Sequence, residues 1–144
     1  MTAARAARTM KGTTVRDVMQ IHMLTAVPEM TVRELAQTLL EGNVRSVPVL
    51  GPEGKILGVA SQADVMRAAM SEAASGASGR GMDAQRVSSV MGPVGPTVSP
   101  GQSVRSLVRL FVRRRVQRAL VVENDMLLGI VTPIDVLGAI DEAA

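Results

Sequence analysis

The residues best suited to chemistry lie in one seven-residue pattern, Gly-x-x-[Ser/Thr]-x-x-Asp, which occurs at residues 58–64 and again at residues 129–135. In both places a strand-like apolar run precedes the hydroxyl and a helical pattern follows it, so the hydroxyl stands where a helix begins. A helix N-terminus offers free N–H groups and partial positive charge to phosphate. A carboxylate three residues later repels phosphate but accepts from two ribose hydroxyls at once. We therefore assign residues to the two roles as follows: Ser61 and Thr132 on the phosphate side, and Asp64 and Asp135 on the sugar.

The same pattern also has a simpler interpretation as a helix cap. A Ser or Thr followed three residues later by an acid satisfies the first N–H groups of a helix, and the acid also favours the helix dipole. One isolated element is more often a cap than a binding site, whereas two elements at matched positions favour a ligand. Capping stays the alternative. A ligand role predicts that Asp64→Ala or Asp135→Ala weakens nucleotide binding without unfolding the chain.

The two elements belong to an internal duplication. Val-x-x-Val-Met at residues 15–19 recurs at 87–91, and Thr-x-x-Pro at 25–28 recurs at 97–100, both at an offset of 72. One residue is then lost, so the Gly-x-x-[Ser/Thr]-x-x-Asp elements are 71 apart. A Ser-, Gly- and Ala-rich stretch between the copies is typical of a mobile linker. We expect the following division: a disordered basic tail at 1–12, a first domain at 13–74, a linker at 75–85 and a second domain at 86–143.

Each copy shows the same order of elements: strand, helix, strand, strand, helix. In the first copy we expect strands at Thr25–Val27, Ser46–Leu50 and Ile56–Ala60, and helices beginning after the capping box at Thr31 and at about Gln62. In the second copy we expect strands at Thr97–Ser99, Ala119–Val122 and Leu127–Val131, and helices beginning after Ser103 and at about Pro133. The fold class is mixed α/β (α+β). Because one copy is too small for a comfortable core, we expect two β-α-β-β-α repeats packed sheet to sheet about a pseudo-twofold axis.

This doubled arrangement resembles a pair of CBS (cystathionine-β-synthase) domains, a Bateman module of the free-standing bacterial type. The resemblance depends on four features, each repeated in order: Val15-x-Asp17-x-Met19, Thr25-x-x-Pro28, Val44–Val49 and the Gly58–Asp64 element. It covers almost the whole chain. The family implies regulation by AMP, ADP, ATP or S-adenosylmethionine, held in clefts between paired domains, and association of modules into disc-shaped dimers.

The resemblance also extends the set of ligand-contact residues. A basic residue just before the second strand often reaches phosphate in the family, and Arg118 matches that position, whereas the first copy has Arg45 one place earlier and Ser46 at the match. The resemblance implies that the base lies against Thr25 or Thr97 and against the backbone before and within the second strand. The second copy is the better equipped. The full predicted set is Thr25, Arg45, Ser46, Val47, Pro48, Ser61, Asp64, Thr97, Arg118, Ala119, Leu120, Thr132 and Asp135.

The composition argues against most catalytic and metal chemistry. The chain has no cysteine and a single histidine, His22, which removes thiolate nucleophiles and multi-histidine metal sites. Its only aromatic residue, Phe111, leaves little for stacking nucleobases, so we disfavour nucleic acid as a partner. We expect no cofactor and no enzyme activity. No apolar run approaches the roughly 18 residues of a membrane span, and a cytoplasmic location without membrane association follows as an expectation.

Three functions remain in competition. The leading one is a regulatory module that binds an adenosine nucleotide, forms a homodimer and signals to an unidentified effector protein. A ligand-free dimerisation and docking module is the second. Nucleic-acid binding is the third, because seven arginines and no acid occur between Ala84 and Val122. Within that run Arg105, Arg109 and Arg113 form a stripe whose mutual repulsion is offset by Glu34 and Glu41 of a dimer partner, by nucleotide phosphates, by a partner's acids or by solvent.

Overall fold

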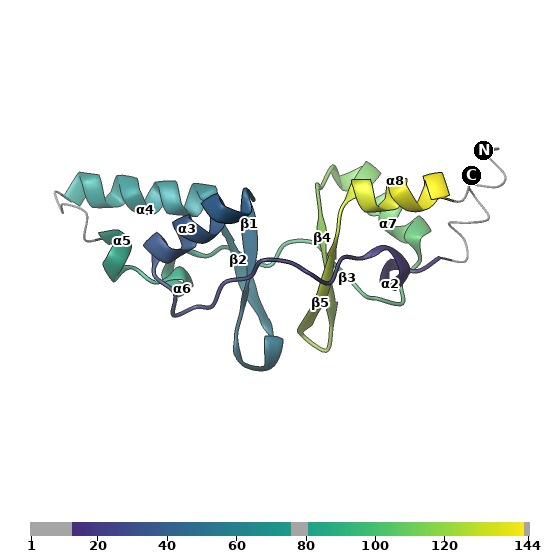
Figure 1. Ribbon diagram of the computed structural model, residues 1–144, viewed down its shortest axis with the longest axis horizontal. Helices are drawn as coiled ribbons and strands as arrows, with labels where there is room; N and C mark the ends of the chain where they lie inside the picture. The colour runs from purple at the N-terminus through teal and green to yellow at the C-terminus, as the bar shows by residue number, and fades with distance from the viewer. Residues whose placement is uncertain (1–12, 76–80, 143–144) are drawn as a thin grey trace. The chain divides into compact units, whose positions relative to one another are not determined.

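The computed structural model describes residues 13–75 and 81–142. The predicted tail, the middle of the predicted linker and residue 143 of the second predicted domain lie outside this range. The chain divides into two compact units, Leu24–Val94 and the combination of Met1–Met23 with Gly95–Ala144. We name them the first-copy unit and the second-copy unit after the repeat that supplies most of each. Their helices and strands are labelled in Figure 1.

The first-copy unit contains a hairpin and the helices that accompany it. Its elements are α3 (Val32–Gly42), β1 (Ser46–Leu50), a 3₁₀ turn η1 (Pro52–Gly54), β2 (Ile56–Ser61), α4 (Gln62–Ser75), α5 (Gly81–Ala84) and α6 (Val87–Val90). The antiparallel β1–β2 pair places Ser46 opposite Ser61. The strand expected at Thr25–Val27 is reduced to one parallel bridge between Ala26 and Val49. The order predicted for this copy is otherwise confirmed.

The second-copy unit repeats this design with a third strand. Its elements are α2 (Val15–Val18), β3 (Thr97–Val98), α7 (Val104–Arg114), β4 (Ala119–Glu123), β5 (Met126–Val131) and α8 (Pro133–Glu142). Strand β3 runs parallel to β4, and β4 pairs antiparallel with β5. Asn124 and Asp125 connect β4 to β5 with φ of 52° and 65°. Two consecutive positive φ values are typical of the two-residue turn that matches strand twist in a hairpin.

The short helix at the start of each sequence copy packs with the body of the other copy. The N–H of Val15 in α2 donates to the carbonyl of Gln102 at 2.8 Å, and the N–H of Val87 in α6 donates to the carbonyl of Met30 at 2.8 Å. Both valines are fully buried. The compact units therefore divide the chain after Met23 and after Val94, whereas the predicted domains begin at residues 13 and 86.

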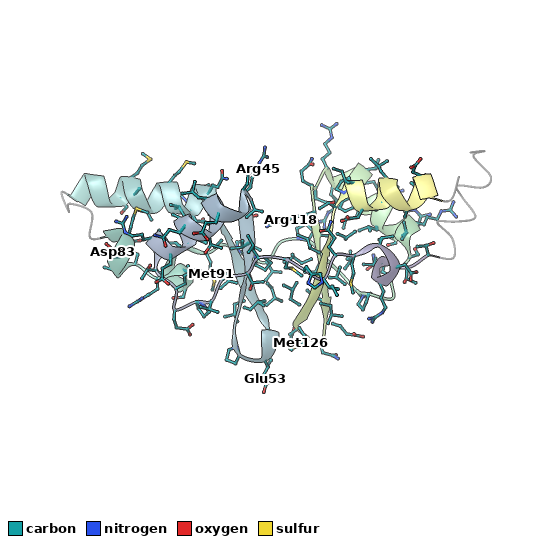
Figure 2. All side chains as sticks on the ribbon, viewed as in Figure 1. Arg45, Glu53, Asp83, Met91, Arg118 and Met126 are labelled. Carbon is teal, nitrogen blue, oxygen red and sulfur yellow. The ribbon has the colours of Figure 1, made fainter. Side chains whose placement is uncertain are left out.

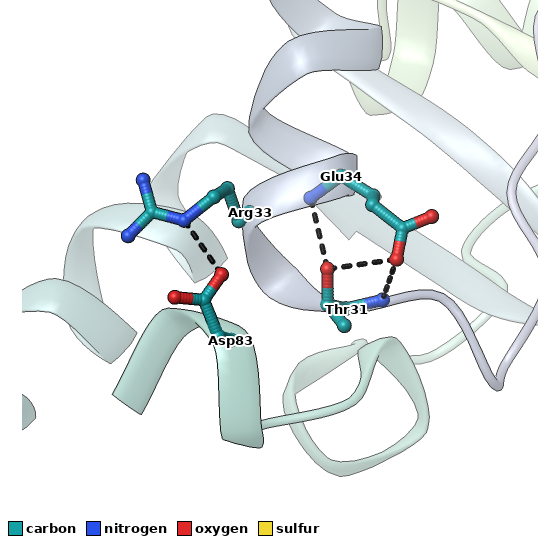
Figure 3. A network of polar contacts seen from close by, with 4 residues as sticks. All are labelled: Thr31, Arg33, Glu34 and Asp83. Carbon is teal, nitrogen blue, oxygen red and sulfur yellow. Dashed lines mark hydrogen bonds and ion pairs between the residues drawn. The ribbon is translucent and has the colours of Figure 1, made fainter. Parts of the chain in front are cut away.

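Part of the predicted linker is ordered. Residues 81–84 form α5, and its Asp83 carboxylate accepts a hydrogen bond from Arg33 Nε of α3 at 2.7 Å (Figure 3). Next to this pair, Thr31 and Glu34 form the capping box expected at the start of α3: the Thr31 hydroxyl accepts from Glu34 N at 3.1 Å, and Glu34 accepts from Thr31 N at 3.3 Å. An exposed ion pair stabilises weakly, so it orients α5 more than it strengthens the unit.

Each unit has its own apolar core, and the two cores use equivalent positions of the repeat. Leu35 and Val49 are fully buried in the first-copy unit, as are Leu107 and Val121, 72 residues later, in the second-copy unit. One apolar residue near the end of each helix faces away from the core: Leu40 is 79% exposed, and its equivalent Val112 is 72% exposed. Burial of the leucines and valines of the cores stabilises each unit. The exposed Leu40 and Val112 side chains remain available for contact with another molecule.

Candidate functional site

In the first-copy unit both carboxylate oxygens of Asp64 are hydrogen-bonded within the segment that contains Ser61 and the start of α4. Asp64 Oδ2 accepts hydrogen bonds from the Ser61 N–H at 2.8 Å and from the Ser61 hydroxyl at 3.0 Å. Asp64 Oδ1 accepts from the guanidinium of Arg67, one turn along α4. Asp64 is only 5% exposed. Both oxygens therefore have partners, and this carboxylate presents little surface to a ligand.

In the second-copy unit the equivalent carboxylate is differently placed. Asp135 Oδ2 accepts from the Thr132 N–H at 2.8 Å and from its hydroxyl at 3.0 Å, as Asp64 does from Ser61. The caps differ at the third residue, because the Asp64 N–H donates to the Ser61 hydroxyl at 3.3 Å and the Asp135 N–H donates to the Thr132 carbonyl at 3.1 Å. Its Oδ1 accepts from the side-chain amide of Gln20 at 2.6 Å, across 115 residues of sequence. Asp135 is partly exposed and Gln20 is exposed. A neutral, exposed amide holds this oxygen, and a ligand hydroxyl can take its place at lower cost than it can displace an ion pair.

The two sites obtain the second hydrogen bond from opposite positions of the repeat. The position of Arg67 is occupied by Gly138 in the second copy, and the position of Gln20 is occupied by Gly92 in the first copy. Each site thus has one donor where the other has glycine. Sequence reasoning missed both donors; the signal was a polar residue aligned with a glycine at these two places.

The glycine of each element is required by a close approach of backbone. A Cβ built on Gly58 would lie 2.6 Å from the carbonyl oxygen of Gly92, and one on Gly129 would lie 2.7 Å from the carbonyl oxygen of Gln20. These carbonyls belong to the segments that follow α6 and α2, and they bond the adjacent strands: the Val59 N–H donates to Gly92 O at 3.1 Å, and the Ile130 N–H donates to Gln20 O at 2.9 Å. Because Gly129 has no side chain, the segment that contains Gln20 can pass close enough to the strand for the Gln20 amide to reach Asp135.

The remaining predicted residues lie near the ends of the hairpin strands that carry the capping residues. Val47, Ala119 and Leu120 are 1–2% exposed, so only their backbone groups can reach a ligand. In the first-copy unit Pro48 is buried as well, Thr25 and Ser46 are partly exposed and Arg45 is exposed; in the second-copy unit Thr97 is exposed. Register places Ser46 opposite Ser61, Thr97 beside Leu120, and Ala119 opposite Val131, one residue before Thr132. Each copy's predicted set therefore lies within one unit.

The two predicted basic residues differ in their surroundings. Figure 2 labels Arg45, which precedes β1, and Arg118, which precedes β4. The Arg45 side chain is exposed and has no hydrogen bond or ion pair with the described residues. Arg118 is half-buried, and burial lowers the pKa of its guanidinium from its ordinary value. An anion next to Arg118 would offset the cost of that burial.

A metal centre and a membrane-spanning helix are both absent from the part of the chain that the structure describes. Among residues 13–71 and 81–141, whose side chains the structure describes, no three His, Asp or Glu side chains are grouped to hold a metal ion. Within the same ranges no helix combines the length and apolarity that a bilayer crossing needs. The capped helix starts, with their carboxylates, stay the features best suited to ligand chemistry.

Comparison with known proteins places the chain in a family. The family model described as "CBS domain" matches residues 15–71 and again residues 87–142. The chain belongs to the CBS-domain family and carries two copies of the domain. The chain is 27% identical over 117 residues to the CBS domain-containing protein YhcV of Bacillus subtilis, and the match covers 81% of this chain and 78% of YhcV. Matches to two uncharacterized proteins of Methanocaldococcus jannaschii cover only 33% and 40% of those proteins' lengths.

Solved structures show the same fold. A putative acetoin utilization protein (AcuB) from Vibrio cholerae gives a TM-score of 0.75 at 22% identity, with 90% of each chain covered. The CBS domain of a bacterial CNNM/CorC family Mg²⁺ transporter in complex with ATP gives 0.74 at 25% identity and covers 96% of this chain and 94% of that one. CBSX2 in complex with AMP gives 0.72 at 24% identity, with 91% and 98% covered.

Proposed function

We propose that this CBS-domain pair is a non-catalytic regulatory module that binds an adenosine-containing ligand, with the second-copy site filled first. One observation carries the proposal: Asp135 is a partly exposed carboxylate at a capped helix start, and its Oδ1 is held by a single neutral amide at 2.6 Å. Vicinal ribose hydroxyls are donors of the kind that this oxygen accepts. Pro133 has no N–H, and the N–H groups of Thr132 and Asp135 are already bonded at 2.8 and 3.1 Å. The Ile134 N–H is therefore the donor that the start of α8 offers to the phosphate side.

The chemistry of the ligand is supported by the relatives. The structures similar to this chain include one in complex with AMP, one in complex with ATP and one in complex with 5′-methylthioadenosine and S-adenosyl-L-methionine. All four ligands contain an adenosine or thioadenosine group. We therefore assign the shared adenosine part to the site and leave the choice among AMP, ADP, ATP and S-adenosylmethionine to titration.

Ligand binding at this site would affect residues far away in the sequence. A ribose hydroxyl that bonds Asp135 Oδ1 competes with the Gln20 amide, and Gln20 belongs to the segment whose backbone bonds Ile130 at 2.8 and 2.9 Å. The segment that carries α2 would thereby respond to occupancy. We infer that this response is the signal passed to an effector protein.

We also propose that the chain forms a homodimer. In the first-copy unit Leu40 is 79% exposed, Met66 is 60% exposed and Met70 is 73% exposed, and the first two line an open groove of about 360 Å³ on α3 and α4. In the second-copy unit Val112 and Leu137, the equivalents of Leu40 and Met66, are 72% and 62% exposed. Apolar surface of this kind marks interaction sites.

Titration with AMP, ATP and S-adenosylmethionine by calorimetry and thermal shift tests the adenosine proposal. A ligand at 100 times its dissociation constant stabilises by about 2.7 kcal/mol, which a melting curve detects. Asp135→Ala is expected to weaken binding by about 10- to 150-fold, because it removes a ribose acceptor worth about 1.5–3 kcal/mol.

Asp135→Ala also removes a helix cap, so a control must show that losing a cap does not by itself weaken nucleotide binding. Glu34→Ala is a matched control, because Glu34 accepts from the Thr31 N–H at 3.3 Å and from its hydroxyl at 3.0 Å at the start of α3, in the other unit and outside the predicted ligand set. The control is expected to keep full affinity. If all three ligands leave the melting curve unchanged, the adenosine proposal is wrong. The engaged and buried Asp64 would then favour the alternative, a ligand-free dimerisation and docking module.

A further inference from the structure

Helix α7 and its cap carry five arginines whose charge is not balanced by the described residues. The α7 arginines are Arg105, Arg109, Arg113, Arg114 and Arg115. All five are exposed, and none of their side chains makes a hydrogen bond or ion pair with residues 13–71 or 81–141, whose side chains the structure describes. Three of them follow one another at i, i+4 spacing, which destabilises a helix by a few tenths of a kcal/mol for each pair. The helix therefore bears a cost that no described contact offsets.

The first copy shows that the fold does not need these arginines. At the offset of 72, Arg109 corresponds to Gln37, Arg113 to Glu41 and Arg114 to Gly42. Helix α3 nevertheless has the same 11-residue length as α7, from Val32 to Gly42 and from Val104 to Arg114. Arg105 alone has an arginine counterpart, Arg33, so the extra positive charge of the second copy begins at Arg109.

Arg115 adds a conformational observation. It caps α7 with φ of 52° and ψ of 33°, in the left-handed region, and its counterpart Asn43 caps α3 with φ of 50° and ψ of 46°. Asn tolerates this conformation well, whereas a long side chain adopts it at a cost of about 1 kcal/mol. The second copy therefore keeps a cation at a position where a cheaper residue serves in the first.

Three of the arginines line one hollow. An open pocket of about 470 Å³ lies between α7 and the edge strand β3, and all of its lining residues belong to the second-copy unit. We name it the α7 arginine pocket; it is lined by Thr97, Val98, Gln102, Ser106, Arg109, Leu110, Arg113 and Arg114. No acid is among them. Ser106 Oγ accepts from the Gln102 amide at 2.6 Å, so its own hydrogen remains available to an acceptor.

We propose that the α7 arginine pocket binds a small phosphate chain, of the pyrophosphate or triphosphate class, at a site other than the Thr132–Asp135 element. Guanidinium groups bind phosphate oxygens through paired N–H donors, and three guanidinium groups match a ligand with several negative charges. The hydroxyls of Ser106 on α7 and of Thr97 on β3 donate to the remaining oxygens. A nucleic-acid strand is a poorer match, because strand-binding surfaces stack bases on exposed aromatic rings and the chain has one aromatic residue.

The test uses inorganic pyrophosphate and tripolyphosphate as probes of the full chain, by calorimetry at two salt concentrations. We expect saturable binding of one probe per chain, weaker at high salt. The double variant Arg109→Gln with Arg113→Glu copies the first copy's residues into α7, so the helix is expected to form. It should lower probe affinity at least about ten-fold. Arg105→Gln is the matched control on the same helix, outside the pocket lining, and should leave most of the affinity.

Several results would overturn the proposal. They are the absence of saturable binding, an equal loss in Arg105→Gln and in the double variant, and binding of oligonucleotides with no binding of pyrophosphate. Loss of pyrophosphate binding in Asp135→Ala would also overturn it, because the phosphate would then belong to the adenosine site. Replacement of Arg109 and Arg113 by lysine keeps the charge without the paired donors, and an intermediate affinity is expected. Failure of the adenosine proposal leaves this test unaffected, since its probes contain no adenosine.

Discussion

Gly129→Ala should destabilise the second-copy unit through one specific collision. The added Cβ would lie 2.7 Å from the carbonyl oxygen of Gln20 and 3.0 Å from the sulfur of Met19. The φ of Gly129 lies outside the left-handed region, so the backbone itself accepts alanine and the cost is steric. Moving the Gln20 segment away weakens its two backbone hydrogen bonds to Ile130, at 2.8 and 2.9 Å.

The magnitude follows from these contacts. Overpacking costs about 1–3 kcal/mol, and each weakened backbone bond adds up to about 1 kcal/mol, so we expect about 2–4 kcal/mol in the free energy of unfolding. For a chain of this size that lowers the melting temperature by roughly 5–15 °C. The displaced Gln20 amide also leaves Asp135, so we expect altered nucleotide affinity in the same variant.

Thermal and urea unfolding of the variant measure this effect against a matched glycine. Gly138 lies inside α8, and a Cβ built on it meets nothing within 4 Å. Gly138→Ala should therefore stabilise by about 0.5–1 kcal/mol, through helix propensity alone. Equal stability of Gly129→Ala and the wild type would refute the close-approach argument.

Two further predictions concern carboxylates. Arg67→Met removes the partner of Asp64 Oδ1. The arginine of this pair is exposed and the carboxylate is nearly buried, so we expect the variant to lose stability and to leave Oδ1 open to a ribose hydroxyl. We expect up to about five-fold tighter nucleotide binding at the first site; calorimetry in an Asp135→Ala background isolates that site, and unchanged or weaker binding would contradict the idea. The Thr14 backbone and hydroxyl hydrogen bonds hold the pKa of Asp17 below its ordinary value of 3.8. The ionised Asp17 stabilises the fold above the unfolded pKa, and this stabilisation is lost as the pH falls through the lower folded pKa. The melting temperature of Asp17→Asn should therefore fall less than that of the wild type as the pH is lowered below about 4.

Local sequence was sufficient to predict most of the framework. The β1 bounds Ser46–Leu50 are those expected, and α4 and α8 begin at Gln62 and Pro133 as expected. Hydrophobic period, caps and turn residues act over a few positions, so a single sequence displays them. The duplication and the family also follow from the sequence, because matched spacing is visible without coordinates. The wrong expectation at Thr25–Val27 concerns a segment with one bridge, where neighbouring strands and not propensity set the strand length.

The tertiary structure decided which residues complete each site. The sequence by itself determined the repeated Gly-x-x-[Ser/Thr]-x-x-Asp elements and the bonding of each hydroxyl to the carboxylate three residues later. It did not show that Gln20 meets Asp135 from 115 residues away, or that Asp64 is buried while Asp135 stays partly exposed. The Arg67–Asp64 pair is different, because its i,i+3 spacing on one helix is visible in the sequence. The Gln20–Asp135 contact depends on how the segment after α2 passes over the strands of the other copy. Periodicity along the chain carries no information about that path, because it is set by packing between segments distant in sequence.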